Sequence, residues 1–583
     1  MKTLVTIKKL FYLLNQIKIK NKYYLAISTI TAFLVGLTEI LLLSLIAVFI
    51  SSLDSNTTPI QSSPISYFQN IFIDFEPFNQ PIYLSGVGLI IVSLLLILFR
   101  ILHLYLYSLL STSIGMDLTE KSINSIYSQE YSFFNTNTSS SLITRISYLR
   151  SIATQVIQPF ILSISSALSA IFLLIFLIAS EPYLAFTALT LLVSLYVVTV
   201  LINKPRLKSI SEVLGNEESV LLNELKSSFS AIKEVIIARK IGFFSGRIIE
   251  KTSLILNQYR SLIFYMAYPR IVIEGFSIVL IASLALTINI TKPGTSAIVP
   301  LGILLIGIQR LLPSIQIFYQ SFSSLTSSQY IIDSTFSLLK LQGNYPCSEP
   351  IPLSSTKLYD KALFDEHFQS LKIDDLSFSY GTQRIFNRLS FSLLKSEKIA
   401  IVGPSGSGKS TLLDILLGLR IPSSCSIHLN NSRLQGSNLA FDSWWSKLTY
   451  VPQGFYLTGN TIIENIAFGV PCDEIDFENI STSLYLSMLD SFVDSLPLGL
   501  HTEVGENGSL LSGGQKQRLS IARSLYFYNR NKILVFDEAT SALDKDTENT
   551  ILMRIIVSLN PTFVCVTHRL ETLTYFDKII QLE

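Results

Sequence analysis

The sequence is poor in charged residues, and the charges that it has are nearly balanced. Asp, Glu, Lys and Arg make up 15% of the 583 residues, whereas an average soluble protein has roughly 25%. The formal net charge of +2 gives no indication of nucleic-acid binding, which favours strongly basic surfaces. A single core is excluded by the length, because chains beyond about 250–300 residues divide into domains. The sequence therefore predicts two domains or more, one of them strongly apolar.

Cysteine is equally scarce. The four cysteines lie in the C-terminal part of the chain, and their spacing matches no metal site: Cys347, Cys425, Cys472 and Cys565. Because disulfides are rare in reducing compartments, we interpret these residues as reduced thiols of a cytosolic domain.

Long apolar runs, in contrast, fill the chain before residue 325. Six stretches are each long enough to cross a bilayer as a helix, which takes about 20 residues: 24–52, 82–110, 157–180, 182–203, 264–290 and 296–322. Helices buried in a soluble core are the alternative, which six such runs disfavour. A signal peptide is disfavoured because the first run is too long and no cleavage site follows it.

The loops between these runs indicate an orientation. Residues 1–22 contain six lysines and no acidic residue, whereas the loop 54–81 contains Asp54, Asp74 and Glu76 and no Lys or Arg. Positive charge concentrates on the cytoplasmic side, so we predict a cytoplasmic N-terminus in a cytoplasmic (inner) membrane.

Two kinds of helix are expected on the cytoplasmic side. Within 1–22, four apolar residues share one helical face, which predicts an amphipathic elbow helix along the inner leaflet: Leu4, Ile7, Phe11 and Leu14. The segments 111–156 and 204–260 are too polar to span but helical in pattern. We expect them to extend the spans into the cytosol and to turn at 131–135 and 227–234, with plain solvated loops as the alternative.

Charged residues near the inner ends of the spans have a simple explanation. A charge at the centre of a spanning helix costs about 2.5–3.5 kcal/mol on insertion scales. Arg100 and His103 fall near the inner interface, where we expect their side chains to snorkel toward the headgroups. Arg270 is placed similarly, and Glu274 one turn away can neutralise it.

Glu39 and Arg310 fall well inside the hydrocarbon. Two interpretations stand for these residues: they pair with each other or with another span, or they line a wet substrate cavity. Pro313, one turn beyond Arg310, is expected to kink the sixth helix.

A glycine-rich loop at 403–411 carries the first chemical signal of the C-terminal half. It follows the apolar strand Lys398–Val402 and precedes a helix predicted over 410–419. Backbone N–H groups and a helix N-terminus in this arrangement cradle phosphates, with the lysine on the β- and γ-phosphates of ATP and the serine after it on Mg²⁺. The nucleotide-contacting residues predicted here are Gly403, Ser405, Gly406, Ser407, Gly408, Lys409, Ser410 and Thr411.

A second apolar strand, predicted over 533–538, ends in two carboxylates. Asp537 has the position of a magnesium-binding Walker B aspartate, and Glu538 is placed to act as general base on the attacking water. A strand that ends in Asp is a weak signal alone, but downstream of the phosphate loop it predicts ATP hydrolysis.

The motif Leu-Ser-Gly-Gly-Gln at 511–515 resembles the signature sequence of ABC ATPases, and this resemblance covers 371–583. It implies that four residues before or in a predicted helix contact an ATP molecule held by a second copy: Ser512, Gly513, Gly514 and Gln515. Two copies would then bury two ATP molecules head to tail. Lys516 and Arg518, on the helix that follows, are interpreted as surface charges.

The same resemblance assigns roles to further residues. Tyr380 resembles the aromatic residue that stacks on adenine. Gln453 resembles the glutamine that touches Mg²⁺ and senses the membrane domain, and His568 resembles the switch histidine on the γ-phosphate. The segment 541–544 resembles the D-loop, which Asp544 ends.

The whole chain resembles type IV (exporter-type) ABC half-transporters, an α-helical six-span transmembrane domain joined to an α/β P-loop NTPase domain. This implies an ATPase coupled to transport, working as a homodimer, with a heterodimer as the alternative. The expected boundaries are 1–22 for the elbow helix, 23–325 for the transmembrane domain, 326–369 for an irregular linker and 370–583 for the nucleotide-binding domain. The segment 502–508 resembles the exporter X-loop, which favours export over import.

The cargo has the weakest signal in the sequence. Short strings around Glu39, Glu274 and Arg310 resemble lipid-linked oligosaccharide flippases and polysaccharide-export relatives, and a cationic Arg310 suits a lipid pyrophosphate. We therefore favour a lipid or glycolipid-type cargo and no nucleic-acid partner. Multidrug, lipid and peptide exporters stay open, as does a nucleotide-gated channel or regulator, whereas the six spans argue against a non-transporting ABC ATPase.

Overall fold

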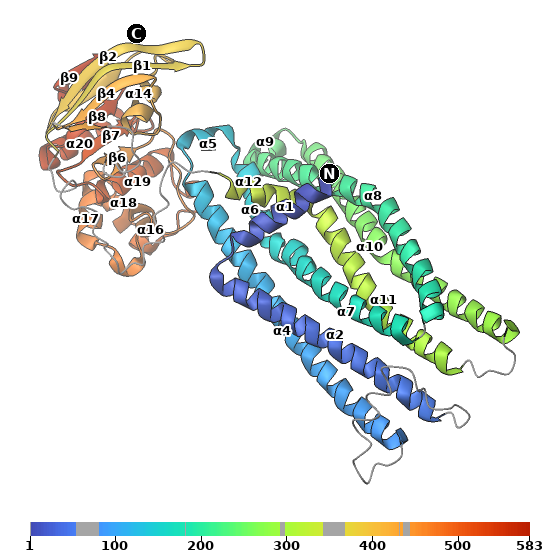
Figure 1. Ribbon diagram of the computed structural model, residues 1–583. Coiled ribbons are helices and arrows are strands. Elements are labelled where there is room, and N and C mark those ends of the chain that lie inside the picture. The colour runs from blue at the N-terminus through green and yellow to red at the C-terminus, as the bar shows by residue number, and fades with distance from the viewer. Residues whose placement is uncertain are drawn as a thin grey trace. The chain divides into compact units, whose positions relative to one another are not determined.

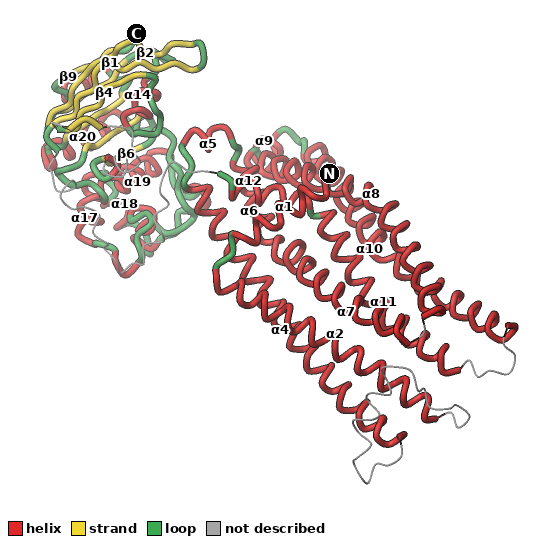
Figure 2. The backbone as a smooth tube through the Cα atoms, in the orientation of Figure 1, coloured by secondary structure: helices red, strands yellow, loops and turns green. Residues whose placement is uncertain are grey.

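The chain divides into two compact units, Met1–Gln129 with Phe134–Gly343, and Glu130–Phe133 with Asn344–Glu583 (Figure 1). The computed structural model describes residues 2–53, 81–180, 182–291, 298–341, 368–430, 432–434 and 444–583. Over these residues the first unit is helical and the second combines helices with two sheets (Figure 2). Asp54, Asp74, Glu76 and Cys347 lie outside the described residues.

The described residues of the N-terminal part of the chain are almost entirely helical. The helices are α1 Lys2–Asn15, α2 Ile19–Leu53, α4 Pro81–Tyr127, α5 Tyr131–Thr136, α6 Ser139–Ile152, the π-helical turn Ala153–Ile157, α7 Gln158–Ser180, α8 Pro182–Ser230, α9 Ile232–Ile237, α10 Ile241–Thr291, α11 Ile298–Ser327 and α12 Gln329–Leu339. Within the described residues, six helical runs are long and apolar enough to cross a membrane, the number that the sequence predicts.

The spanning helices extend well beyond their apolar segments. α8 has 49 residues and α10 has 51, whereas about 20 residues cross the hydrocarbon. The short helices α5 and α9 lie where the sequence predicts the two cytoplasmic turns. The prediction that the spans continue as helices is therefore confirmed.

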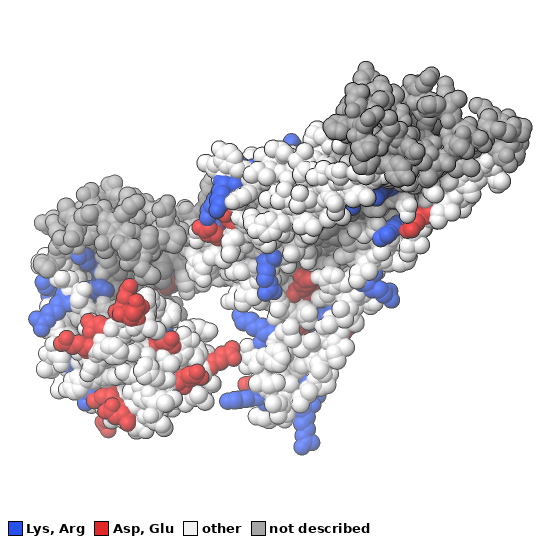
Figure 3. Space-filling view, turned by 90° about the horizontal axis from the view of Figure 1, so that it is seen from below, with Lys and Arg blue, Asp and Glu red and all other residues white. Residues whose placement is uncertain are grey.

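The surface of the membrane helices is largely apolar. α4 exposes Ile90, Leu94, Leu98 and Ile101, which follow one another at helical spacing and form a stripe on one face. In the space-filling view of Figure 3, much of the first unit's visible surface carries no charged side chain, whereas acidic and basic side chains are interspersed over the second unit. An apolar outer face is what lipid contact requires.

A π-helical turn interrupts the run from α6 to α7. Such a turn breaks the regular hydrogen-bond pattern of the helix, and buried carbonyl groups need other donors. Ser111 Oγ on α4 donates to the Ala153 carbonyl at 2.9 Å, and Ser324 Oγ on α11 donates to the Gln155 carbonyl at 3.0 Å. Hydroxyl groups from two neighbouring helices thus fix this turn.

The elbow helix α1 packs one face inside the first unit. Leu10 and Leu13 are buried in a cluster with Ile114 and Ile331, whereas Phe11 is exposed, as a residue facing the leaflet would be. The side chains of Leu4 and Ile7, which complete the predicted apolar face, lie outside the described part of the structure.

The linker prediction is wrong at its start. The sequence analysis expects irregular structure from residue 326, but α11 continues to Ser327 and α12 occupies Gln329–Leu339. Ile331, Ile332 and Leu338 are fully buried, so apolar burial stabilises a helix here. Residues 342–367 of the predicted linker lie outside the described ranges.

Arg100 does not snorkel as the sequence predicts. Its guanidinium Nη2 lies 2.5 Å from Oε1 of Glu39 on α2, and Glu39 is buried. Glu39 is therefore paired with another span rather than with Arg310. His103 also turns inward, and its Nδ1 lies 3.1 Å from Oγ1 of Thr31.

Two other expectations for the spans can be compared with the structure. Arg270 lies 3.6 Å from Glu274, as predicted for neighbours one turn apart. Pro313 lies within α11, which continues as a helix past it. Arg310 is half-buried and has no ion pair or hydrogen bond among the residues that the structure describes.

The second unit contains an antiparallel and a parallel sheet. The strands are β1 Ser370–Tyr380, β2 Gln383–Leu394, β3 Lys398–Val402, β4 Ser424–Leu429, β5 Ser432–Leu434, β6 Leu448–Val451, β7 Ile533–Asp537, β8 Thr562–Val566 and β9 Lys578–Gln581. Strands β2-β1-β4-β5 form the antiparallel sheet, and β6-β7-β8-β3-β9 form the parallel sheet. β3 has the bounds that the sequence predicts, and β7 ends at Asp537, one residue before the predicted end.

The second unit also contains helices. They are α14 Lys409–Leu416, α16 Ile462–Ile466, α17 Phe477–Leu486, α18 Asp490–Asp494, α19 Gly513–Tyr526 and α20 Lys545–Leu559, with 3₁₀ turns at Cys472–Glu474, Gly499–His501, Glu506–Gly508 and Leu570–Tyr575. Of these helices, α14, α19 and α20 pack against the parallel sheet, whereas α16, α17 and α18 form a separate apolar cluster with α19. Every residue of β7 and β8 is buried, so these strands form the centre of the core. Cys425, Cys472 and Cys565 form no disulfide.

Candidate active site

The predicted catalytic motifs gather at the carboxyl ends of three parallel strands. The glycine-rich loop follows β3, Asp537 ends β7 with Glu538 directly after it, and His568 comes two residues after β8. Strands β7, β8 and β3 are neighbours in the sheet. This edge is where open parallel sheets bind ligands.

The backbone of the glycine-rich loop requires glycine at several positions. Gly406 and Gly408 have φ angles of +87° and +93°, which glycine adopts without strain. A Cβ atom on Gly403 would lie 2.6 Å from the Leu582 carbonyl oxygen, and one on Gly408 would lie 2.6 Å from Ile385 Cγ2. The loop therefore folds as a tight cradle in which backbone N–H groups can approach a phosphate.

Lys409 and Ser407 are also placed to bind a phosphate. Lys409 is buried, and its Nζ donates to the carbonyl groups of Gly403 and Pro404 at 2.9 Å each, which holds the ammonium against the loop. Ser407 Oγ is buried without a hydrogen-bond partner among the described residues, and a phosphate oxygen would accept from it. Ser405 and Ser410 are exposed along this segment.

Tyr380 lies beside the loop with its ring partly exposed. Its hydroxyl lies 3.3 Å from Thr411 Oγ1, and the guanidinium of Arg420 lies 5.1 Å from its ring centroid. Arg420 Nε in turn donates to Asp414 at 2.8 Å. Sequence reasoning missed Arg420, because an arginine that stacks on a distant tyrosine leaves no local pattern.

Glu538 is the centre of the predicted catalytic group. Gln453 Nε2 donates to its Oε2 at 2.7 Å, and His568 Nε2 lies 2.6 Å from its Oε1. The structure thus brings together three residues that are far apart in the sequence. The φ angle of Glu538 is +47°, a conformation that non-glycine residues rarely adopt and that concentrates at functional sites.

Asp537 is the buried neighbour of this group. Tyr450 donates its hydroxyl hydrogen to Asp537 Oδ2 at 3.3 Å. Burial raises the pKa of the Asp537 carboxyl, and the charge of Glu538 raises it further. Both effects disfavour the ionised form of the Asp537 carboxyl, and the positive charge of a bound divalent cation would favour that form.

The donor set fits a magnesium ion that is held partly by its nucleotide. Among the described residues no group of three or more His, Cys, Asp or Glu side chains could hold a metal by itself. Mg²⁺ is bound by one or two protein groups together with phosphates and water, and the predicted ligands Ser410, Gln453 and Asp537 belong to that type of site.

The signature motif forms a helix N-terminus. α19 begins at Gly513, earlier than the predicted start near Gln515, and Ser512 is its N-cap. Gln515 N donates to Ser512 Oγ and Ser512 N donates to Gln515 Oε1, which together make a capping box. A Cβ atom on Gly513 would meet nothing within 4 Å, so the N-terminus of α19 is open, whereas the Gln515 side chain is occupied by the cap.

Sequence reasoning also missed Gln517, which is fully buried in α19. Its Oε1 accepts from Ala542 N at 2.8 Å, so it ties the signature helix to the D-loop. The interpretation of Arg518 as a surface charge is wrong, because it is half-buried and Nη1 donates to the Met488 carbonyl at 2.5 Å. Lys516 Nζ donates to the Asn507 carbonyl at 3.0 Å.

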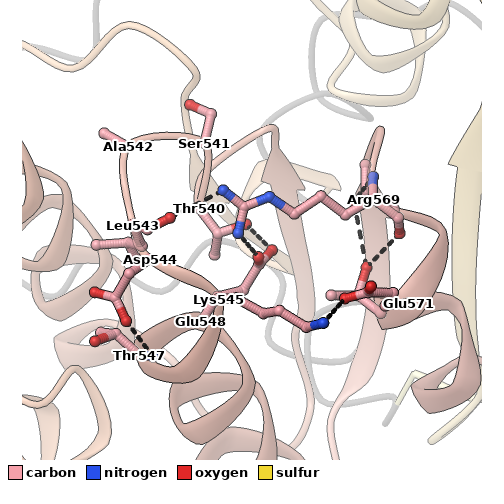
Figure 4. Close-up of polar contacts among 12 residues, drawn as sticks. Thr540, Ser541, Ala542, Leu543, Asp544, Lys545, Thr547, Glu548, Arg569 and Glu571 are labelled. Atoms are coloured by element: carbon pink, nitrogen blue, oxygen red, sulfur yellow. Dashed lines mark hydrogen bonds and ion pairs between the residues drawn. The ribbon is translucent and has the colours of Figure 1, made fainter.

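An ion pair between Arg569 and Glu548 holds the D-loop (Figure 4). Arg569 contacts the buried carboxylate of Glu548 on α20 and donates to the Leu543 carbonyl at 2.9 Å. Thr540 Oγ1 donates to the other Glu548 oxygen at 2.5 Å. Asp544 caps α20 by accepting from Thr547 N at 2.9 Å, and this hydrogen bond lowers the pKa of the Asp544 carboxyl.

Comparison with known proteins agrees with both units. The family model described as ABC transporter transmembrane region matches residues 25–287. The family model described as ABC transporter matches residues 386–541. The chain is an exporter-type ABC half-transporter.

Relatives of this half-transporter have different cargos. An ATP-dependent lipid A-core flippase of Ralstonia nicotianae is 29% identical over 500 residues, 82% of this chain and 79% of the relative. The mycobactin import ATP-binding/permease protein IrtB of Mycolicibacterium thermoresistibile is 37% identical over 215 residues, 37% of this chain and 36% of the relative. A solved bacterial Atm1-family ABC exporter with ATP bound has a TM-score of 0.73 at 21% identity, covering 96% of this chain and 93% of that one, which shows the fold.

Proposed function

We propose that this half-transporter works as a dimer in the cytoplasmic membrane, with its ATPase unit in the cytosol, and exports or flips a lipid-linked, sugar-bearing cargo at the expense of ATP. The observation that carries the proposal is the Glu538 group. Gln453 and His568 hold one carboxylate at the sheet edge that also carries the Lys409 loop, in a chain with six candidate spans.

The residues divide the work of hydrolysis. The 403–411 loop and Lys409 hold the phosphates, while Ser410, Asp537 and Gln453 hold Mg²⁺, which neutralises charge on the phosphates. Glu538 accepts a proton from the attacking water, and His568 stabilises the γ-phosphate. The open N-terminus of α19 completes the site of a second copy. Shifting a two-state equilibrium from 1:99 to 99:1 takes about 5.5 kcal/mol of differential binding, which two ATP molecules buried between copies supply.

The cargo class is supported by Arg310 and by the relatives. Because Glu39 is paired with Arg100, Arg310 is left without an ion-pair partner in the described part of α11 and its neighbours. A half-buried cation in a spanning helix without a counter-ion favours an anionic ligand, and a lipid phosphate or pyrophosphate supplies one. The relative from Ralstonia nicotianae is named for flipping lipid A-core, which is a lipid cargo.

Glu538→Gln tests the catalytic assignment. We expect ATP turnover to fall by about 10²–10⁴-fold, which is the rate enhancement that a general base usually contributes. ATP binding should persist, so closed dimers should accumulate. The matched control is Glu571→Gln, since Glu571 is an exposed carboxylate paired with Lys545. Undiminished turnover in Glu538→Gln would remove Glu538 from the mechanism.

Vesicle reconstitution tests the cargo. A fluorescent polyprenyl-diphosphate oligosaccharide should change leaflet in wild-type vesicles only when ATP is present, and it should stimulate ATP turnover. Arg310→Ala should lose this stimulation, whereas Arg260→Ala, at an exposed position of α10, should keep it. Equal stimulation of both variants, or movement of a hydrophobic drug but not of the sugar lipid, would reject this cargo class.

A further inference from the structure

A polar cavity lies inside the first unit, outside both the ATP site and the Arg310 region. Its volume is about 710 Å³, and it is lined from α6, α8 and α12. Most of its lining side chains end in a hydroxyl or an amide, and Val220 is the one aliphatic side chain among the described residues around it. A volume of this size is typical of small-molecule sites, but the lining is far more polar than usual.

The charges of the lining leave one cation without a partner. Glu212 pairs with Lys208 at 3.2 Å, and Asp333 pairs with Lys9 at 2.6 Å. Arg145, on α6, is half-buried and has neither an ion pair nor a hydrogen bond to any described residue. The Arg145 guanidinium is therefore free to bind a phosphate in a bidentate manner. Glu218, which accepts a hydrogen bond from Tyr259 and contacts Tyr148, is a further carboxylate behind the tyrosine wall.

The hydroxyl groups of the lining point to a second part of the ligand. Ser334 Oγ is buried without a hydrogen-bond partner among the described residues, and a buried hydroxyl is normally satisfied. Tyr148 and Tyr330 pack edge to face with ring centroids 5.0 Å apart, which makes one wall rigid. Hydroxyls and amides both donate and accept hydrogen bonds, as recognition of a sugar requires.

The position along α6 limits where the ligand comes from. The predicted apolar span begins at residue 157, so Arg145 lies roughly 18 Å along the helix from it, at 1.5 Å per residue. A phosphate attached directly to a lipid anchor stays at the membrane surface and does not reach this depth. The ligand is either free in the cytosol or a distal part of a glycan.

We propose that this cavity binds a sugar-phosphate group, with Arg145 on the phosphate and the hydroxyl-rich walls on the sugar. Two sources share this chemistry: a free sugar phosphate, or a phosphorylated sugar in the headgroup of a glycolipid. The second source rests on the proposed function and the first does not. Because three helices converge on the ligand, its binding also links the cytoplasmic ends of three separate spans.

Calorimetric titration of the full-length protein in nanodiscs tests the site. Glucose 1-phosphate should bind, and glucose and inorganic phosphate should each bind more weakly. Arg145→Gln should weaken glucose 1-phosphate binding by roughly 10–100-fold, the range for a charged hydrogen bond, and leave glucose binding unchanged. Arg150→Gln, at an exposed position on the same helix outside the lining, should bind as the wild type does.

The outcomes separate this proposal from folding defects and from the transport proposal. Wild-type ATP turnover in Arg145→Gln without sugar phosphate would show that the variant is folded. Absence of glucose 1-phosphate binding to the wild type, or an equal loss in both arginine variants, would overturn the proposal, even if transport is observed. If phosphorylated lipopolysaccharide in the nanodisc competes with glucose 1-phosphate for binding, the ligand is a glycolipid headgroup. If it does not compete, the ligand is a free sugar phosphate.

Discussion

Single residues determine whether the spans tolerate charge, and Glu39 is the clearest case. Its Oε1 is paired with Arg100, while Oε2 is buried without a partner among the described residues. Arg100→Leu leaves the buried Glu39 carboxylate without its counter-ion, and an unpaired buried charge is destabilising. We expect a loss of stability in Arg100→Leu, measured by circular dichroism during unfolding, and near-wild-type stability in Glu39→Leu/Arg100→Leu.

Lys208→Leu is the control for this pair. Lys208 and Glu212 are an i,i+4 pair on the part of α8 that extends beyond its apolar segment, and such exposed pairs are worth about 0.3–0.5 kcal/mol. Two results would contradict the role of the Glu39–Arg100 pair. One is a loss of stability in Lys208→Leu as large as that in Arg100→Leu, and the other is a Glu39→Leu/Arg100→Leu variant no more stable than Arg100→Leu.

Asp537 shows the conflict between stability and catalysis at one residue. Its pKa is raised by burial, so the protonated carboxyl stabilises the fold at pH values below its ordinary pKa of 3.8, and that contribution is lost as the pH rises through the raised pKa. Asp537→Asn should therefore be more stable than the wild type at pH 7, by about 0.5–2 kcal/mol, and inactive. The two tryptophans, Trp444 and Trp445, both lie in the second unit, so their fluorescence follows its unfolding.

Asp544→Asn removes a carboxyl group whose pKa is shifted in the opposite direction from that of Asp537. The hydrogen bond from Thr547 lowers the pKa of Asp544, so its contribution is present above pH 3.8 and is lost as the pH falls through the lowered pKa. The stability advantage of Asp537→Asn should vanish below pH 3.8. An advantage that persists there would mean that the carboxyl group's charge is not its source.

At the scale of elements, the contact between Arg569 and Glu548 fixes α20 and the D-loop to the segment after His568. Glu548 is almost fully buried and also accepts from Thr540. Glu548→Ala should destabilise the second unit by about 3–5 kcal/mol and lower kcat, because the D-loop loses its anchor. Lys545→Met breaks only an exposed pair and should cost less than about 1 kcal/mol. Tryptophan fluorescence and ATP turnover check both, and equal effects would contradict the role of this contact.

The sequence predicts elements well where their signal is local. β3 and β7 are continuous apolar runs, and the glycines at 403–408 impose a loop wherever they occur, so these parts could be predicted. α12 could not, because its helix depends on burial of Ile331 and Ile332 against residues distant in the chain. For the same reason the partners of Glu39, Gln517 and Glu548 escaped prediction: a contact between two helices is not written in the spacing of either one.

At the scale of the whole molecule, the proposed dimer gives each chain two halves of different ATP sites. The phosphate loop follows β3, whereas the signature N-terminus at Gly513 begins α19, and its open approach suits the nucleotide of another copy. In a head-to-tail dimer, one site combines the loop of the first chain with α19 of the second, and the other site the reverse. Defects placed on different chains should then fall in the same site.

Mixed dimers test this arrangement directly. Lys409→Ala disables the phosphate loop, and Gly513→Asp places a carboxylate at the α19 N-terminus, where it occupies the anion-binding position and repels the phosphates. Each variant alone should form an inactive homodimer. A dimer of one Lys409→Ala chain and one Gly513→Asp chain, isolated through two affinity tags, holds both defects in one site and leaves the other site intact. Its ATP turnover should therefore exceed that of either homodimer, whereas turnover as low as in the homodimers would mean that loop and signature act within one chain.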